Sequence, residues 1–285
     1  MIKLFFKINL PILLIAAGLY GCVNLKTINV FSSTALESTR KFEDLEYSFK
    51  QNCLDNCHNK SITDLTLDPQ ICDCKANEKA DSITLVIYQA IKGYFDGLAK
   101  LSDNKLTSYK TDPLSKPLAA FKYGSFSLDK THVEAYSIIS GILLRAFTDK
   151  YRGQKLKEFI IAGNDPIKTL IGFLDFNLSA NLVGKLNVQI QVNKEIYFDL
   201  TKDATLSTYD KRKAVEEYYQ LNDKIERRQN ELLTYSKTLK KLAEGHQTLV
   251  DNIGKMGTDE FKEMVISYAS YIQNLNSEFN KVANK

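Results

Sequence analysis

The apolar positions along this chain recur mostly at intervals of three and four residues, the spacing of one face of an α-helix. The longest unbroken series starts at Tyr218 and ends at Ile253, and its steps alternate between three and four. Its members are Tyr218, Leu221, Ile225, Arg228, Leu232, Tyr235, Leu239, Leu242, His246, Leu249 and Ile253. This series predicts a coiled-coil seam of about five heptads on a helix over residues 207–254. At about 1.5 Å per residue such a helix is roughly 70 Å long, so we expect an elongated protein.

Shorter series of the same kind predict further helices on both sides of this one. They span approximately residues 33–53, 77–101, 131–150, 155–161, 166–201 and the region from 258 onward. The alternating stretch Val188–Val192 resembles a strand, but its flanks keep the helical period, so we assign it to a helix. The least regular region is 102–126, where we expect loops and one short helix from Pro117 to Tyr123. These patterns predict an all-α fold, an elongated helical bundle with a long antiparallel coiled-coil-like C-terminal half.

The N-terminus carries a secretory signature. Two lysines precede the apolar run Ile8–Leu19, which is too short to cross a bilayer of about 30 Å as a helix and suits a signal-peptide core. The run leads into Leu19-Tyr20-Gly21-Cys22, which resembles the lipobox of bacterial lipoproteins, although Tyr20 departs from the small residue usual at its position. The resemblance covers residues 1–22 and implies cleavage after Gly21 and acylation of Cys22 on its thiol and new amine. The alternative is an uncleaved anchor with a chance cysteine.

The chain therefore divides into four predicted parts. Residues 1–21 form the signal peptide and residues 22–32 a lipidated tether. A disulfide-braced helical subdomain follows over residues 33–163, and a long antiparallel helical bundle over residues 164–285. The boundary is placed at Gly163–Pro166 because Asp165 is a good helix cap and Pro166 suits the first position of a helix.

Four cysteines remain besides Cys22, namely Cys53, Cys57, Cys72 and Cys74. An even number of thiols in an exported chain suggests two disulfides. The first two cysteines lie on one helix face and the chain then returns through the other two, which favours the nested pairs Cys53–Cys74 and Cys57–Cys72. Other pairings remain possible. A zinc site with the nearby His58 is the alternative, although its spacing is unusual and export disfavours free thiolates.

Charge excludes one class of partner. The predicted signal peptide holds two of the 38 basic residues and none of the 34 acidic ones, so the side-chain charge of the remaining 264 residues is +2. We expect no nucleic-acid partner because that class needs a basic stripe. The densest basic run, Lys211–Lys213, is followed by Glu216 and Glu217, which is typical of a solvated helix face.

Motifs for chemistry are sparse. The sequence has no Gly-x-Ser-x-Gly, no His-Glu-x-x-His, no phosphate-binding glycine loop and no dinucleotide fingerprint. We therefore expect no enzymatic activity, no catalytic residue, no cofactor and no metal ion. His246 lies on the seam, where a histidine is most often a polar residue that sets the register. Tyr219 lies off the seam and could anchor a partner, whereas an enzyme would need a pocket around residues such as His132 and Glu134.

Together these patterns predict a monomeric or weakly associating lipoprotein, held in the cell envelope by lipid on Cys22. Val23 follows the cysteine, and in enterobacteria this resembles the outer-membrane sorting signal, so the outer membrane is favoured over the inner. We expect a non-enzymatic binding or scaffold protein with a protein partner in the envelope. One form is an inhibitor or immunity-type protein that captures a toxin or phage component. The alternatives are a structural subunit of an envelope or secretion assembly, or an envelope hydrolase.

Overall fold

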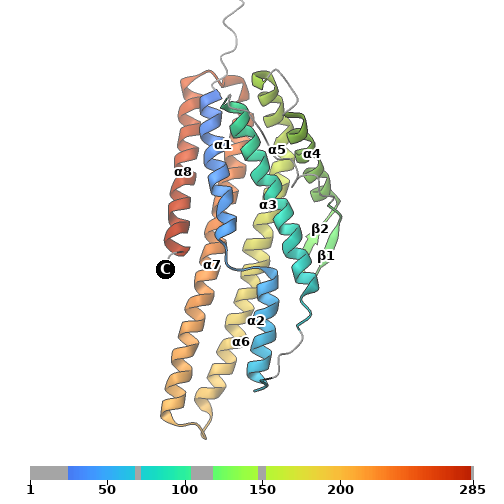
Figure 1. Ribbon diagram of the computed structural model, residues 1–285. Coiled ribbons are helices and arrows are strands. Elements are labelled where there is room, and N and C mark those ends of the chain that lie inside the picture. Colours follow the sequence, from blue (N-terminus) through green and yellow to red (C-terminus); the bar gives the residue numbers. More distant parts are fainter. Residues whose placement is uncertain (1–24, 68–71, 104–117, 147–151, 284–285) are drawn as a thin grey trace, which may run out of the picture.

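The computed structural model describes residues 25–67, 72–103, 118–146 and 152–283. Over these ranges the chain is an elongated bundle of α-helices with one small β-hairpin, which confirms the all-α fold (Figure 1). The helices are α1 (Leu25–Arg40), α2 (Phe49–Thr63), α3 (Lys75–Ser102), α4 (Lys130–Ala146), α5 (Arg152–Phe176), α6 (Val183–Lys202), α7 (Thr208–Asp251) and α8 (Asp259–Ala283). Short helical turns are η2 (Lys41–Asp44), the π-helical η4 (Asn177–Leu182) and η5 (Ile253–Lys255). Within the described ranges, none of the helices combines the length and apolar content needed to cross a bilayer.

Helix α7 is the longest element, and it contacts α5, α6 and α8. Its bounds agree closely with the predicted 207–254, and Ser207 caps its first turn by accepting a hydrogen bond from the Asp210 amide. The predicted seam is buried from Ile225 to Leu249. Helices α6 and α8 run antiparallel to α7 on different sides, and α7 continues well past the end of α8 (Figure 1). The α6–α7 pair therefore projects as a hairpin from one end of the bundle.

The predicted tether at 22–32 was wrong from Leu25 onward, because α1 begins there and packs between α3 and α8. Ile28 and Phe31 are 0% exposed. The single helix predicted over 33–53 is interrupted: α1 ends at Arg40, η2 follows, and α2 starts at Phe49. Residues 22–24 and the whole predicted signal peptide lie outside the described residues.

The predicted break at Gly163–Pro166 does not occur, because α5 continues through Pro166. Proline removes only one amide from the helix, and the helix is held on both sides of it by buried residues such as Ile160 and Ile167. One hydrophobic cluster includes residues from both predicted parts of the chain, for example Phe31 of α1 and Leu242 of α7. The two parts thus share a core.

The short helix predicted over Pro117–Tyr123 was also wrong. The described part of this region forms a hairpin of β1 (Phe121–Tyr123) and β2 (Phe126–Leu128), in which Phe121 pairs with Leu128 and Tyr123 with Phe126. Gly124 occupies the turn with φ +57°, a conformation that glycine adopts without strain. Phe126 is buried against the rings of Phe49 and Phe173, with centroid separations of 5.2 and 5.5 Å.

The seam of α8 differs by one position from the expected one. The spacing of Tyr268, Tyr271 and Leu275 predicts that all three lie on the seam. Tyr271 is exposed instead, whereas Ile272 and Phe279 are buried. Helix α8 packs against α1 as well as α7, so its buried face is directed between two helices. The small Ala269 also lies on this buried face.

Candidate functional site

Inside the bundle, the strongest candidate for a functional site is a hydrogen-bonded network around the buried His246 of α7. The Tyr94 hydroxyl of α3 lies 2.7 Å from His246 Nε2, and Asn164 Oδ1 of α5 lies 3.1 Å from His246 Nδ1. Because the amide oxygen can only accept, Nδ1 carries the proton and Nε2 accepts from the tyrosine hydroxyl. The network therefore joins three helices through one neutral imidazole.

Burial keeps this imidazole neutral. The pKa of His246 is lowered from 6.5 to about 3, first by burial and then by the positive charge of Lys168. Burial also raises the pKa of the Tyr94 hydroxyl well above its usual value. Both groups are thus uncharged near neutral pH, and neither is poised to exchange a proton there.

Close packing leaves little space beside the network. A Cβ added at Gly163 would lie 2.5 Å from the Tyr94 hydroxyl oxygen, and a Cβ added at Gly245 would lie 2.7 Å from Phe31 Cε2. The network extends outward, since Asn164 and Lys168 both donate to Gln247 Oε1, at 2.9 and 2.7 Å. These bonds join α3, α5 and α7 at one level of the bundle.

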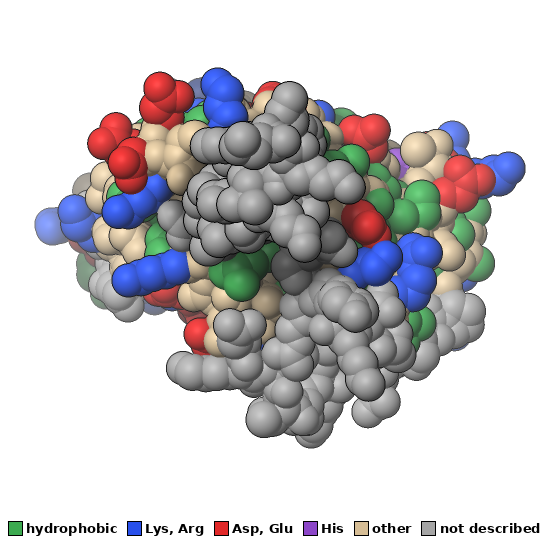
Figure 2. All heavy atoms as spheres, turned by 90° about the horizontal axis from the view of Figure 1, so that it is seen from above, with side chains coloured by type: hydrophobic (Ala, Val, Ile, Leu, Met, Phe, Trp, Pro, Cys, Tyr) green, Lys and Arg blue, Asp and Glu red, His purple; other side chains and the backbone are tan. Residues whose placement is uncertain are grey.

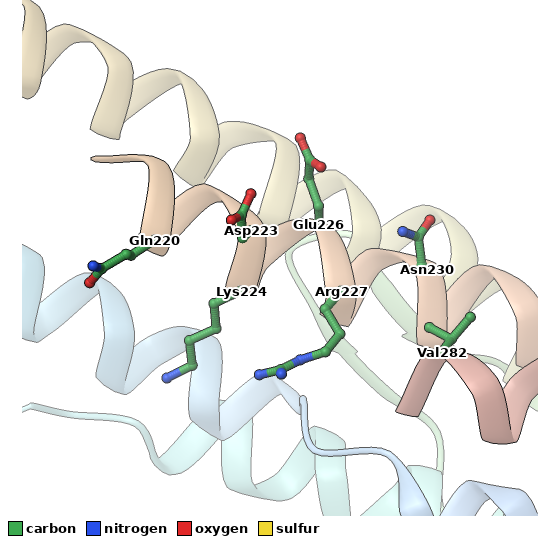
Figure 3. Close-up of a pocket in the computed structure, with 7 residues that line it drawn as sticks. All are labelled: Gln220, Asp223, Lys224, Glu226, Arg227, Asn230 and Val282. Atoms are coloured by element: carbon green, nitrogen blue, oxygen red, sulfur yellow. The ribbon is translucent and has the colours of Figure 1, made fainter. Parts of the chain in front are cut away.

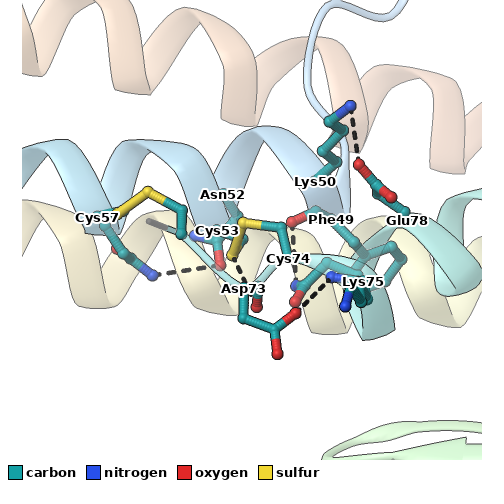
Figure 4. The surroundings of a disulfide bond; sticks show 12 residues. Phe49, Lys50, Asn52, Cys53, Cys57, Asp73, Cys74, Lys75 and Glu78 are labelled. Atoms are coloured by element: carbon teal, nitrogen blue, oxygen red, sulfur yellow. Dashed lines mark hydrogen bonds and ion pairs between the residues drawn. A yellow bond between two sulfur atoms is a disulfide. The ribbon is translucent and has the colours of Figure 1, made fainter. Parts of the chain in front are cut away.

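The four cysteines near α2 form two disulfides in the structure. Cys53 is joined to Cys74 (Figure 4) and Cys57 to Cys72, which is the nested pairing favoured by the sequence rather than the zinc alternative. His58 lies beside them on the exposed side of α2. Among the described residues, no three His, Cys, Asp or Glu side chains are grouped to hold a metal ion.

Two polar contacts hold the start of α2 against α3. The Asp81 carboxylate accepts hydrogen bonds from the amides of Phe49 and Lys50, each at 2.9 Å. Asn77 Nδ2 donates to the Phe49 carbonyl at 3.1 Å, close to the salt bridge between Lys50 and Glu78 (Figure 4). The disulfides and these bonds together position a helix that buries few apolar residues of its own.

An ion pair joins α2 to α7 farther along. Arg228 Nη1 lies 2.9 Å from Asp55 Oδ2, with 10% and 16% of the two side chains exposed. The guanidinium also lies over the ring of Tyr47, 5.0 Å from its centroid. Its place on the seam predicts a packed stem with the charged head at the edge for Arg228. The structure buries the side chain further and pairs it with Asp55.

An open depression of about 530 Å³ lies on α7, next to the end of α8 (Figure 3). It is lined by Gln220, Asp223, Lys224, Glu226, Arg227, Asn230 and Val282. Lys224 and Arg227 point to one side of α7, whereas Asp223 and Glu226 point to the other (Figure 3). The lining side chains are at least partly exposed, and none is fixed by burial in an orientation for catalysis.

Exposed aromatic residues gather at the projecting hairpin, which we call the distal tip (residues 197–219). Phe198, Tyr209 and Tyr219 are 57%, 75% and 62% exposed. Tyr197, Tyr218 and Tyr219 form a row of rings with centroid separations of 5.6 and 5.5 Å. Charged side chains beside them pair with one another, as Arg212 does with Glu216 at 3.3 Å. The distal tip is therefore rich in rings that a protein partner could cover.

Helix α6 near this tip has an unusual distribution of polarity. Gln189 and Asn193 are buried against the bundle, whereas Val188 and Val192 are directed outward and exposed. Helix α2 ends toward the same end of the bundle (Figure 1), and Leu65 and Leu67 are strongly exposed there. These apolar side chains enlarge the candidate interaction surface beyond Tyr219, the residue that the sequence suggested.

The remaining candidate residues are not brought together. His132 and Glu134 lie on the first turns of α4, where His132 pairs with Asp129 at 2.7 Å and Glu134 is exposed. Cys22 lies outside the described residues. No family model, curated protein or solved structure matches this chain.

Proposed function

We propose that this protein is a bacterial lipoprotein, anchored to a membrane of the cell envelope by lipid on Cys22, that acts there as a non-enzymatic binding or scaffold protein. The observation that carries the proposal is the sequence Leu19-Tyr20-Gly21-Cys22, which is placed two residues before a helical bundle. A lipid at this position would hold the bundle at the surface of a bilayer.

The cysteines support an exported location. Both pairs form disulfides in the structure, and such bonds form and persist mainly in oxidising compartments outside the cytosol. They close short loops around the exposed end of α2, which has too small an apolar face to hold its own position. An oxidising compartment and an N-terminal lipid signal are consistent with each other.

The distal tip supports a binding role. Aromatic residues are enriched at protein interfaces because they bury a large area with little loss of side-chain freedom. Tyr209 and Tyr219 are exposed on α7 without a helix covering them, whereas Tyr235 of the same helix is buried and donates to the Thr39 carbonyl at 2.9 Å. An inhibitor or immunity-type protein would use such a surface to capture a protein that arrives from outside.

The anchor is tested by Cys22→Ser in cells supplied with a labelled fatty acid. We expect the wild-type protein to carry the label and the variant to be unlabelled and unprocessed. The matched control is Val23→Asp, which keeps the modified cysteine and should keep the label. In an enterobacterial host this control should also shift the protein from the outer to the inner membrane. Unchanged labelling of Cys22→Ser would overturn the proposed anchor.

The binding role is tested by photo-crosslinking in the envelope. A photoreactive residue at Tyr219 should give a discrete crosslinked protein, whereas the same residue at Tyr271 of α8 should not, although Tyr271 is also 49% exposed. A Phe198→Ser change in the same chain should reduce the crosslink at Tyr219. Equal crosslinking from both positions would indicate no preference for the distal tip.

A structural subunit of an envelope assembly is the second candidate, and the outward face of α6 favours it. Val188 and Val192 lie one turn apart and form an apolar strip that a neighbouring subunit could cover. A photoreactive residue at Val192 would then give a ladder of repeated crosslinked subunits rather than one crosslinked species.

A further inference from the structure

The start of α1 fixes which end of the bundle a lipid on Cys22 can reach. Ile28 and Phe31 are 0% exposed, so the first turns of α1 are held firmly in the bundle. Three Cα steps separate Cys22 from Leu25, and at 3.8 Å each they span at most about 11 Å. The lipidated residue therefore lies close to the beginning of α1, with no long linker between them.

Contacts between α1 and α7 show what lies level with that point. The Phe31 ring meets Gly245, and Tyr235 donates a hydrogen bond to Thr39. The two helices are antiparallel, so six residues back from Phe31 correspond to six residues forward from Gly245. Leu25 is thus level with Asp251, the last residue of α7, and the α7–α8 turn lies at the same end.

The distal tip lies at the opposite end of the same helix. Helix α7 has 44 residues, and at about 1.5 Å per residue it separates the two ends by roughly 65 Å. Figure 1 shows the same arrangement, with the start of α1 and the α7–α8 turn at the top and the α6–α7 turn at the bottom.

We infer that the end formed by the start of α1 and the α7–α8 turn lies against the phospholipid bilayer, and that the distal tip is presented away from it. This inference rests on the proposed lipid anchor and adds the orientation of the bundle. Viewed from this end, acidic and basic side chains are interspersed among the described residues (Figure 2). The short connection to Cys22 is what sets the orientation in this inference.

The orientation is tested with two single-cysteine labels on the full lipidated protein, purified and inserted into phosphatidylethanolamine–phosphatidylglycerol vesicles. Lys255→Cys places a fluorescent donor in the α7–α8 turn, and Ala204→Cys places one in the α6–α7 turn; both positions are exposed. The vesicles contain an acceptor-labelled lipid. Because the ends are separated by roughly 65 Å, quenching should be at least about threefold stronger at 255 than at 204.

The outcomes distinguish a failure of the proposed orientation from a failure of the proposed anchor. Strong quenching at 255 with weak quenching at 204 supports the orientation. Equal quenching, or stronger quenching at 204, overturns it while leaving the anchor intact, because the protein is still bound to the vesicle. Mass spectrometry of each sample reports lipid on Cys22, and its absence would overturn both the anchor and the orientation. The same labelled proteins made without residues 1–22 should remain unquenched at both positions.

Discussion

The Tyr94 hydroxyl and His246 Nε2 lie 2.7 Å apart in the centre of the bundle, and both groups are buried. Their contact joins α3 to α7 across 152 residues of sequence. No carboxylate takes part in it, and the nearest influential charge is the positive one of Lys168. The site therefore accommodates a neutral imidazole and resists a charged one.

We expect this histidine to make the fold sensitive to acid. The folded-state pKa of His246 is about 3, and the unfolded-state value is about 6.5. Below pH 6.5 the unfolded chain binds a proton at this histidine and the folded chain does not. The free energy of unfolding therefore falls by about 1.4 kcal/mol for each pH unit of acidification, down to about pH 3. Urea unfolding at pH 7.5, 6.5 and 5 should show a loss of roughly 2 kcal/mol from this group between pH 6.5 and 5.

The comparison with His246→Gln isolates that contribution from the carboxylates. Glutamine keeps a polar side chain but cannot titrate, so the variant should be less stable at pH 7.5 and lose less stability on acidification. His132→Gln changes a histidine of α4 that is paired with Asp129 near the surface, and it should leave the steep acid dependence in place. A wild-type slope in His246→Gln would contradict the assignment.

Gly245 and Gly172 give a matched pair of alanine substitutions within helices. A Cβ at Gly245 would lie 2.7 Å from the Phe31 ring, so Gly245→Ala must displace a ring packed in the core. We expect its free energy of unfolding to fall by about 1–3 kcal/mol. A Cβ at Gly172 meets nothing within 4 Å, so Gly172→Ala should raise stability by up to about 1 kcal/mol through helix propensity. Urea unfolding of both variants checks the opposite signs, and equal effects would contradict the close contact.

Long, regular apolar patterns in the sequence predicted most helices of the fold, whereas buried polar residues concealed where the first helix begins. The seam of α7 was predictable because the spacing continues without a break and Ser207 marks its beginning. Helix α1 was partly missed because its buried face mixes small polar residues, such as Ser38 and Thr39, with the large apolar Ile28 and Phe31. Their hydroxyls donate to the carbonyls of Thr34 and Ala35, both at 2.7 Å, so they are buried without unpaired groups.

Some features of the candidate sites could likewise be predicted from the sequence, and others could not. The cysteine pairing was predictable because it depends on neighbouring segments that fold back on each other. The network of His246 was not, since its partners Tyr94 and Asn164 come from helices far away in the sequence. Pro166 suggested a boundary, but packing of the surrounding helix outweighs the one hydrogen bond that proline removes.

The buried ion pair between Asp55 and Arg228 should be costly to break on one side. Arg228→Met leaves the Asp55 carboxylate largely buried without its partner, and we expect a loss of about 3 kcal/mol or more. The double variant Asp55→Asn with Arg228→Met should recover part of this loss, because neither charge is then left unpaired. Lys213→Ala is the control: its pair with Glu217 is exposed at 4.0 Å, so the change should stay within about 0.5 kcal/mol. Additive single effects would show that the buried pair is not coupled.

The nested disulfides can be tested by cleavage on the amino side of aspartate. Such cleavage before every aspartate of this region, including Asp64 and Asp68, places the four cysteines in four separate peptides, 44–54, 55–63, 68–72 and 73–80. Under non-reducing conditions, mass spectrometry should find 44–54 linked to 73–80 and 55–63 linked to 68–72. Any other linkage would contradict the structure around α2.

Removing one bridge should weaken the fold by an amount set mainly by the loop that it closes. The Cys57–Cys72 bond has a sequence separation of 15, for which an isolated loop gives about 3 kcal/mol, and the double change Cys57→Ser with Cys72→Ser should cost less than this because Cys53–Cys74 still encloses the same segment in the unfolded chain. Removal of Cys53–Cys74 should cost less than its own separation of 21 suggests, because the remaining bridge already closes most of that loop in the unfolded chain. Urea unfolding of both double variants and of the wild type under oxidising conditions gives the two costs, and the reduced wild type gives the cost of losing both bridges. A Cys53–Cys74 variant much less stable than the Cys57–Cys72 variant would contradict this expectation. It would show that the bond mainly stabilises the folded contact between α2 and α3, rather than restricting the unfolded chain.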